Sequence, residues 1–214
     1  HPATHISFYD LTGYLTPPEG EDEPHDYQYE ELADALRESR TVGWGYLRWR
    51  TERSRRRAAQ AAAGGELLPD VAVIRGPDGN PVYCALRFTL PTQPEWERMA
   101  RGGDGRAFVF GDEREWLYFK GERSRPTNPA PEPVGLFADD ESVYGIRDLT
   151  GSVAEWTADW DGEGRVFWVK GSSWASQQPE HERIAARRAL PPTAITSTVG
   201  IRLIVRVLEP VSGK

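Results

Sequence analysis

The stretch that most constrains the fold is VAEWTADW at 153–160, where apolar and polar side chains alternate. Small and large apolar residues, including Trp156 and Trp160, fall at every second position, and polar residues such as Glu155 fall between them. A period of two predicts a β-strand with one buried face. The residues TGS at 150–152 are typical of a turn before it. We therefore predict a core strand here, with both tryptophans in the core.

Glu155 is the residue that a core strand leaves unexplained. A carboxylate between large apolar side chains must be paired, hydrogen-bonded or wet. Two roles stay open, a structural hydrogen bond within the fold and a contact with a ligand. We favour the structural role, because buried polar groups are usually satisfied inside the protein.

The composition bounds the class of protein. The chain has 214 residues, enough for one large domain or two small ones. No apolar run approaches the roughly 20 residues of a membrane span, and a net charge of -7 argues against generic nucleic-acid binding. Cys84 is alone, so an intramolecular disulfide is excluded. The compartment stays open, with the cytoplasm favoured. The chain starts at His1 without Met, as a fragment or a processed or recombinant product would.

Local patterns predict a mixture of helices and short strands joined by long loops, which is an α+β domain. The sequence LPTQPEWERMARGG at 90–103 predicts a helix, with Thr92 as N-cap and Glu95 completing a capping box. The other expected elements are a helix entry within 1–16, helices at 27–39 and 48–65, a strand–turn–strand at 71–88, an irregular region at 102–143, and strands at 165–170 and 199–208.

Six arginines between 48 and 57 raise the possibility of a nucleic-acid contact. Nine acidic residues between 19 and 38 can face them, and charge runs are usually solvated faces. We therefore predict no nucleic-acid partner.

Metal ligation has little support in the sequence. The four histidines are not spaced as a helical ligand pair, apart from His1 and His5 at the chain end, with Pro2 between them. The carboxylates Asp139, Asp140 and Glu141 lie together in a loop, where they are either solvated or suited to calcium. We predict no cofactor, with calcium kept as the alternative.

Seven motifs follow one another as they do in a known family. They are HPATHISFYDLTGYL (1–15), LPTQPEWERMARGGDGRAFVFGD (90–112), EPVGLF (132–137), YGIRDLTGSVAEW (144–156), VKGSSW (169–174), RIAAR (183–187) and GIRL (200–203). Together they resemble the formylglycine-generating enzyme (sulfatase-modifying factor) family. The resemblance implies an α+β, C-type lectin-like fold with short twisted antiparallel strands, flanking helices and much irregular loop. It implies a single domain over 1–214, with an unmatched insertion at about 17–85 and the family's first strand and helix upstream of residue 1.

The departures from the family pattern bear on function. The family's oxidase holds copper with two cysteines near the Gly-Gly-Ser-Trp and Arg-x-Ala-x-Arg motifs. Here that span, WASQQPEHERIAARRA at 174–189, has no cysteine, and a soft thiolate pair is what the chemistry needs. The family's calcium-binding asparagine corresponds to Ser152, which puts that site in doubt. The resemblance therefore implies the scaffold of the family without its copper site.

We accordingly predict a non-catalytic module that binds a protein or small-molecule ligand through its C-terminal segment, about 174–198. It would be a module of a larger bacterial protein, such as a Ser/Thr kinase, or a variable protein of a diversity-generating retroelement. The alternative is a metal-dependent oxidase acting on a cysteine-containing peptide, which stoichiometric copper or iron would reveal. The candidate ligand-binding residues are Trp174, Gln177, Gln178, Glu180, His181, Arg183, Arg188, Thr193, Thr196 and Thr198.

Overall fold

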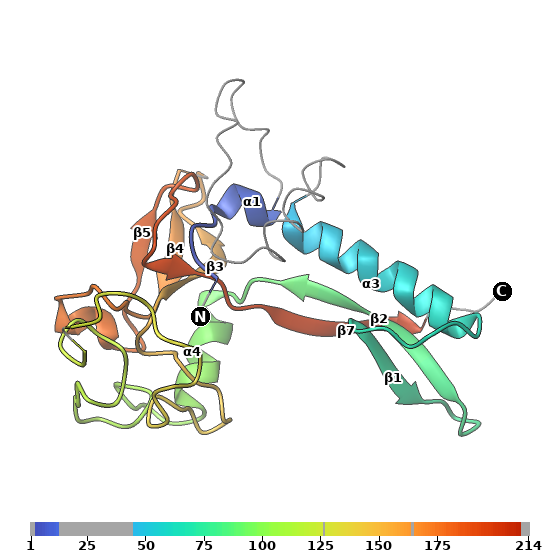
Figure 1. Ribbon diagram of the computed structural model, residues 1–214, viewed down its shortest axis with the longest axis horizontal. Helices are drawn as coiled ribbons and strands as arrows, with labels where there is room; N and C mark the ends of the chain where they lie inside the picture. The colour runs from blue at the N-terminus through green and yellow to red at the C-terminus, as the bar shows by residue number, and fades with distance from the viewer. Residues whose placement is uncertain (1–2, 13–44, 126, 164, 211–214) are drawn as a thin grey trace. The chain divides into compact units, whose positions relative to one another are not determined.

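The computed structural model describes residues 3–12, 45–125, 127–163 and 165–210 (Figure 1). They divide into two compact units. Of the described residues, unit 1 holds 3–8, 90–125, 127–163 and 165–202, and unit 2 holds 9–12, 45–89 and 203–210. Each unit contains a helix and a sheet, and unit 1 also contains much irregular chain. The predicted α+β class is therefore confirmed.

Unit 1 is built on a four-stranded sheet in the order β5-β4-β3-β6. Its pairs are antiparallel except for β3 with β6, which run parallel. The described residues of the region 102–143 form no helix or strand, in agreement with the predicted irregular chain. The elements are α4 (Gln93–Arg101), β3 (Ala154–Trp160), β4 (Phe167–Lys170), the 3-10 helix η1 (Pro179–Glu182), β5 (Arg188–Leu190) and β6 (Val199–Gly200), while α1 (Phe8–Thr12) begins in unit 1 and ends in unit 2.

Helix α4 begins where the sequence predicts. The hydroxyl of Thr92 accepts a hydrogen bond from the backbone amide of Glu95, and the Glu95 carboxylate accepts one from the Thr92 amide at 2.9 Å. This capping box satisfies two amides that a helix start leaves free. The helix then directs Trp96 into the core, where its side chain is almost completely buried.

Trp156 belongs to the buried core of unit 1, as the alternation predicts. Its side chain is fully buried, and its indole nitrogen donates a hydrogen bond to the carbonyl of Ile6 at 3.0 Å. The Phe8 ring meets the Trp156 ring edge-on, with 5.9 Å between the centroids. The segment before α1 thus covers the middle of strand β3.

Trp160 is not in the core, and the prediction for it is wrong. Its side chain is 54% exposed. Trp156 of β3 pairs with Val169 of β4, and Trp160 of β3 pairs with Phe167 of β4. The two pairs are four positions apart along β3 but only two apart along β4. This irregularity ends the regular alternation on which the prediction depends.

The predicted strand at 199–208 is two strands in different units. Residues Val199–Gly200 form β6 in unit 1, and β7 (Ile204–Pro210) belongs to unit 2. The short edge strand β5 was not predicted. Three residues carry too little pattern to distinguish a strand from a loop.

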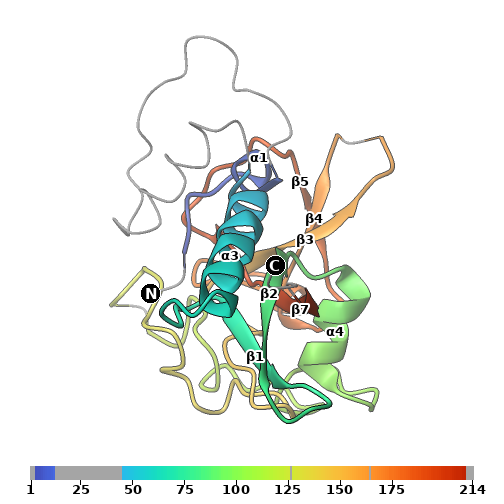
Figure 2. The ribbon, with the colours of Figure 1, turned by 90° about the vertical axis from the view of Figure 1, so that its right-hand side faces the viewer.

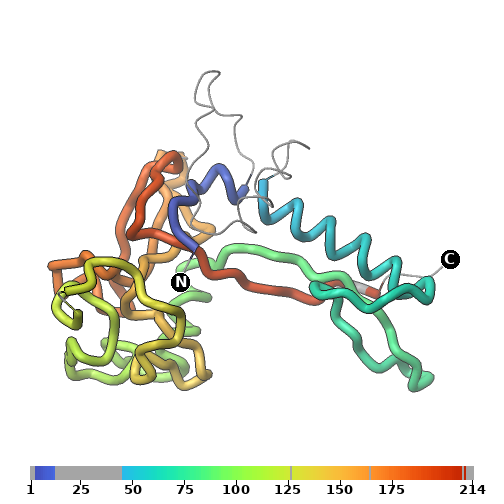
Figure 3. Tube along the Cα trace, viewed as in Figure 1, coloured from blue at the N-terminus to red at the C-terminus, as the bar shows by residue number. Residues whose placement is uncertain are grey.

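Unit 2 pairs the end of the chain with its first half. Its sheet has the order β1-β2-β7, with β1 (Val71–Arg75), β2 (Pro81–Thr89) and antiparallel pairs throughout. Figure 3 shows β7 beside β2. The predicted basic helix and hairpin are confirmed as α3 (Tyr46–Ala62), β1 and β2, whereas the predicted helix at 27–39 lies outside the described residues. The described part of the expected insertion therefore forms a sheet with the C-terminal strand.

Helix α3 runs along β2 and replaces a strand at its edge (Figure 2). Strand β1 pairs with β2 only as far as Ala85. Beyond that point the Leu86 amide donates to the Ser54 hydroxyl at 2.7 Å, and the Phe88 amide donates to the Thr51 hydroxyl at 3.2 Å. Two hydroxyls on one helix face thus satisfy the amides that β1 leaves free.

Replacing Ser54 with alanine is expected to lower the free energy of unfolding by about 1–3 kcal/mol, because the Leu86 amide loses its acceptor. Hydrogen exchange at the Leu86 amide should speed up in step. Exposed Arg56 on the same helix provides the control, and Arg56→Ala should change neither quantity. Unchanged exchange in Ser54→Ala would show that another acceptor holds this amide.

Half of the arginines in the basic run surround one carboxylate. Arg50, Arg53 and Arg57 approach Asp70 at 3.1, 2.6 and 3.6 Å. Burial would raise the pKa of Asp70, but the hydrogen bonds from Arg53 and Arg50 hold it below its ordinary value. Much of the charge run therefore stabilises unit 2 itself.

No helix in the described ranges is long and apolar enough to cross a membrane.

Candidate functional site

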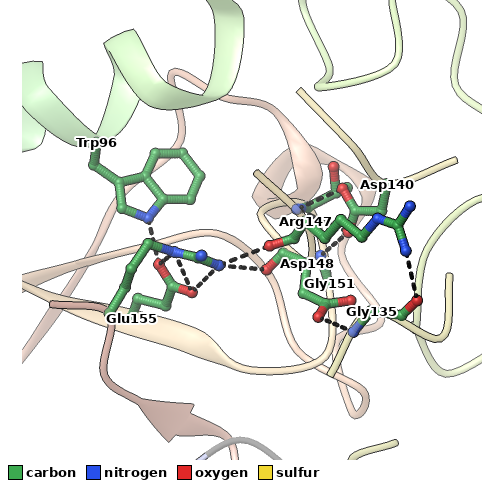
Figure 4. Close-up of polar contacts among 9 residues, drawn as sticks. Trp96, Gly135, Asp140, Arg147, Asp148, Gly151 and Glu155 are labelled. Carbon is green, nitrogen blue, oxygen red and sulfur yellow. Dashed lines mark hydrogen bonds and ion pairs between the residues drawn. The ribbon is translucent and has the colours of Figure 1, made fainter. Parts of the chain in front are cut away.

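Glu155 joins three segments of unit 1 that are far apart in the sequence (Figure 4). The buried carboxylate accepts a hydrogen bond from the indole nitrogen of Trp96 at 2.7 Å. It also accepts from Arg202, whose Nε lies 2.9 Å from Oε2 and whose Nη2 lies 2.7 Å from Oε1. The structural role favoured for Glu155 is confirmed.

Arg202 extends this network to the irregular loop. Its Nη2 donates to the carbonyls of Arg147 and Asp148 at 2.9 and 3.3 Å. Burial alone would lower the pKa of Arg202, but the charge of Glu155 and its hydrogen bonds raise it. The guanidinium is therefore a fixed charge that holds loop and strand together.

The carboxylates of the loop also bind the backbone of the protein. Asp148 accepts from the Gly135 amide at 2.6 Å, and buried Asp140 accepts from the amides of Thr150 and Gly151 at 3.0–3.2 Å. Burial raises the pKa of Asp140 to about 7, against the opposing effect of these hydrogen bonds. The side-chain carboxylates of Asp140 and Asp148 therefore fix the path of the loop backbone.

The stability of the protein is expected to fall as the pH rises from about 4 to about 7. The pKa of Asp140 is 3.8 as an ordinary carboxyl and about 7 when folded. Between these values the folded chain keeps a proton that the unfolded chain has released. The free energy of unfolding therefore decreases through this window, by up to about 4 kcal/mol from this group. Urea unfolding at several pH values measures the slope.

The control for this slope is Asp140→Asn, which removes the titration and keeps one oxygen to accept the Thr150 amide. We expect it to flatten the slope, whereas Asp139→Asn at the exposed neighbouring position should leave it unchanged. A wild-type slope in Asp140→Asn would assign the pH dependence to other groups.

Each metal of the resembled family needs a particular set of ligands. Cys84 is buried in β2 of unit 2, so a copper site with two thiolates does not fit this chain. Glu141 pairs with Arg147 at 2.5 Å. The described ranges hold no group of three or more His, Cys, Asp or Glu side chains arranged for a metal. The absence of a cofactor stays a prediction, and calcium on the loop stays its alternative.

The ten predicted ligand-binding residues lie in unit 1, and they differ in exposure. The exposed ones are Gln177, Gln178, Glu180, Arg183 and Thr193. The half-buried ones are Trp174, His181, Arg188, Thr196 and Thr198.

Three of the half-buried residues hold the loop before β6 in place. The indole nitrogen of Trp174 donates to the Ser197 carbonyl at 3.1 Å. The hydroxyls of Thr196 and Thr198 lie 2.9 Å apart, and the Thr198 amide donates to the Thr196 hydroxyl at 3.1 Å. These three side chains stabilise the predicted surface from within.

A small pocket with a cavity volume of about 10 Å³ lies where the segment 176–182 meets the loop 114–124. Gln177 reaches across to Glu122, with 2.9 Å between Nε2 and Oε1. Arg114 and buried Glu182 form a two-point ion pair, with distances of 2.5 and 2.7 Å. The pocket thus joins one predicted residue, Gln177, to a loop that was not predicted.

The lining of the pocket suits recognition of an amphipathic partner. The arginines and carboxylates in it balance, and the Ser176 hydroxyl is buried without a hydrogen-bond partner among the described residues. Trp116 in the wall is 40% exposed, and the next two residues, Leu117 and Tyr118, are 56% and 39% exposed. Aromatic side chains next to polar groups are enriched in protein interfaces.

Sequence reasoning missed the loop half of this pocket. The sequence EREWLYF at 113–119 has no helical or strand period, so it was assigned only to an irregular region. Adjacent large apolar residues within a polar stretch were the available signal. The pairing of Arg114 with Glu182 spans 68 positions and has no local signature.

Comparison with known proteins places the chain in a family. The model of the sulfatase-modifying factor enzyme 1-like domain matches residues 1–207. Inactive C-alpha-formylglycine-generating enzyme 2 of Bos taurus is 33% identical over 138 residues, which are 56% of this chain and 45% of that protein. Serine/threonine-protein kinase pkn1 of Chlamydia pneumoniae is 28% identical over 132 residues, 53% of this chain and 20% of the kinase. Among solved structures, Treponema denticola variable protein 1 superposes with a TM-score of 0.48, at 25% identity, over 59% of this chain and 48% of that one.

The chain therefore spans less than half the length of these relatives. Three of the family motifs supply the network described above, because Trp96, Glu155 and Arg202 each belong to a different one. The fold is α+β and C-type lectin-like, of the formylglycine-generating-enzyme type, as the motifs predicted. With a family match over almost all of its length, the chain belongs to the family of sulfatase-modifying factor enzyme 1-like domains.

Proposed function

We propose that this chain is a non-catalytic module that binds a protein partner. Its recognition surface would combine the exposed residues of the C-terminal segment with the pocket and the aromatic loop beside it. The observation that carries the proposal is the exposed run Trp116–Tyr118 next to the pocket joined by Gln177 and Glu122. Exposed apolar side chains rimmed by polar groups mark interaction sites.

The chemistry of the segment supports binding over oxidation. The position range 174–189 offers hydroxyl, amide, imidazole, carboxylate and guanidinium groups but no thiol. The relative that is 33% identical carries the description inactive. We propose that the module acts within a larger protein, since the relatives that contain the matching region are longer than this chain.

A selection of displayed peptides on the immobilised chain tests this proposal. Peptides enriched on the wild-type protein should bind Trp116→Ala at least about tenfold more weakly, as removal of an aromatic anchor requires. They should also bind Gln177→Ala more weakly, because that variant loses the amide that reaches Glu122 across the pocket. Trp160→Ala provides a matched control, because Trp160 is also an exposed tryptophan of unit 1. The control should bind as the wild type does.

Equal binding by wild type, Trp116→Ala and Gln177→Ala would place recognition elsewhere and refute this surface. Metal analysis of the purified protein addresses the oxidase alternative. Stoichiometric copper or iron, together with oxidation of a cysteine-containing peptide, would refute the non-catalytic proposal outright.

A further inference from the structure

Three half-buried arginines of unit 1 differ in the hydrogen-bond partners of Nε and Nη2, the two nitrogens on one edge of the guanidinium. Arg114 presents this edge to Glu182, at 2.5 and 2.7 Å. Arg202 presents it to Glu155, at 2.9 and 2.7 Å. In Arg188 both nitrogens are buried, and neither has a hydrogen-bond partner among the described residues.

The position of Arg188 on the sheet explains its burial. In β5 it pairs with Val169 of β4, which pairs in turn with Trp156 of β3. Directly paired residues point to the same face of a sheet, and Val169 and Trp156 are fully buried. The side chain of Arg188 therefore extends along the core face at the edge of the sheet.

No carboxylate of the described residues compensates this charge. Nearby chain segments use their carboxylates elsewhere, since Glu182 pairs with Arg114 and Glu97 pairs with Lys170 at 2.8 Å. The positive charge of Arg188 is felt by His181, whose pKa is lowered by burial first and by Arg188 second. Among the described residues, the guanidinium of Arg188 is thus a buried positive charge without a counter-ion.

We propose that the Nε–Nη2 edge of Arg188 is the receptor for a carboxylate of the ligand. A buried guanidinium without a partner is costly, and a planar carboxylate matches both donors at once. Arg114 and Arg202 show that unit 1 already uses this pairing twice. The inference rests on the proposed function, because Arg188 belongs to the same C-terminal segment.

Nuclear magnetic resonance of the whole chain with ¹⁵N-labelled arginine tests the inference at the atom concerned. The Nε–H signal of Arg188 should shift saturably with sodium acetate or with a capped triglutamate peptide, and not with sodium chloride of equal ionic strength. Arg188→Lys keeps the charge and loses the two-point edge, so binding should weaken about tenfold or more. Arg165→Lys, at an exposed arginine of unit 1 outside this segment, is the matched control and should bind normally.

The outcomes separate the sources of the carboxylate. Saturation by acetate and peptide alike identifies a free small carboxylate as sufficient, and saturation by the peptide alone identifies a protein-borne one. No saturable shift with either, or equal weakening in Arg165→Lys, overturns the inference and leaves buried water as the partner. If the selected peptides still need Trp116 but bind Arg188→Lys normally, the binding module stands and the carboxylate receptor fails.

A second variant tests whether this edge of Arg188 is uncompensated, by the melting temperature of the protein. Arg188→Met removes an uncompensated charge and keeps an aliphatic side chain. The melting temperature of the ligand-free protein should therefore rise, as it does when buried charges are replaced by apolar groups. A lower melting temperature would mean that the edge is already compensated, and would contradict the proposal.

Discussion

Replacing Trp156 with alanine is expected to lower the free energy of unfolding by about 3–5 kcal/mol. The side chain is fully buried, and its indole nitrogen binds the Ile6 carbonyl. The change would leave a cavity under Phe8 and a carbonyl without its donor. Urea or thermal unfolding followed by tryptophan fluorescence and circular dichroism measures the loss.

Trp160→Ala is the internal control, because it removes the same side chain from the same strand. Trp160 is 54% exposed, so we expect a cost below about 1 kcal/mol. Equal costs at the two positions would contradict the core described here, and the cause would then lie in the strand rather than in burial.

The second large effect concerns the ion pair of Glu155 and Arg202 in unit 1. Arg202→Met should lower the free energy of unfolding by about 3–5 kcal/mol, because it leaves the buried carboxylate of Glu155 without its counter-ion. The variant also frees the carbonyls of Arg147 and Asp148. Denaturant unfolding of the single variants gives the individual costs.

The double variant Glu155→Gln with Arg202→Met tests whether the charge is the cause. Glutamine keeps an oxygen for the indole nitrogen of Trp96 and carries no charge. The double variant should therefore be more stable than the sum of the two single losses predicts. Strict additivity would show that the two residues stabilise the fold independently.

Features with a local signature were predictable from the sequence. The capping box needs only Glu95 three positions after Thr92, and the strand–turn–strand of 71–88 carries its turn residues in one run. The basic helix was recognised in the same way. In each case the hydrogen bonds that fix the element lie within it or beside it.

Features set by distant pairing were not predictable. The alternation predicts Trp160 in the core, but the register shift between β3 and β4 leaves it exposed. The pattern at 199–208 predicts one strand, but its two ends belong to different sheets. The site shows the same limit. The C-terminal segment could be named from its motifs, but the loop around Arg114 becomes part of the pocket only through Glu182.

The long reach of the bonds around Glu155 has a consequence for the order of folding. Trp96 lies 59 positions before Glu155, Arg202 lies 47 positions after it, and Ile6 lies 150 positions before Trp156. Contacts of such sequence separation slow folding, because the chain must close large loops before it gains them. During synthesis Glu155 has no counter-ion until Arg202 leaves the ribosome. We therefore expect unit 1 to stay open to chaperones and proteases until that moment, and nascent chains released after residue 202 should be the first to resist proteolysis.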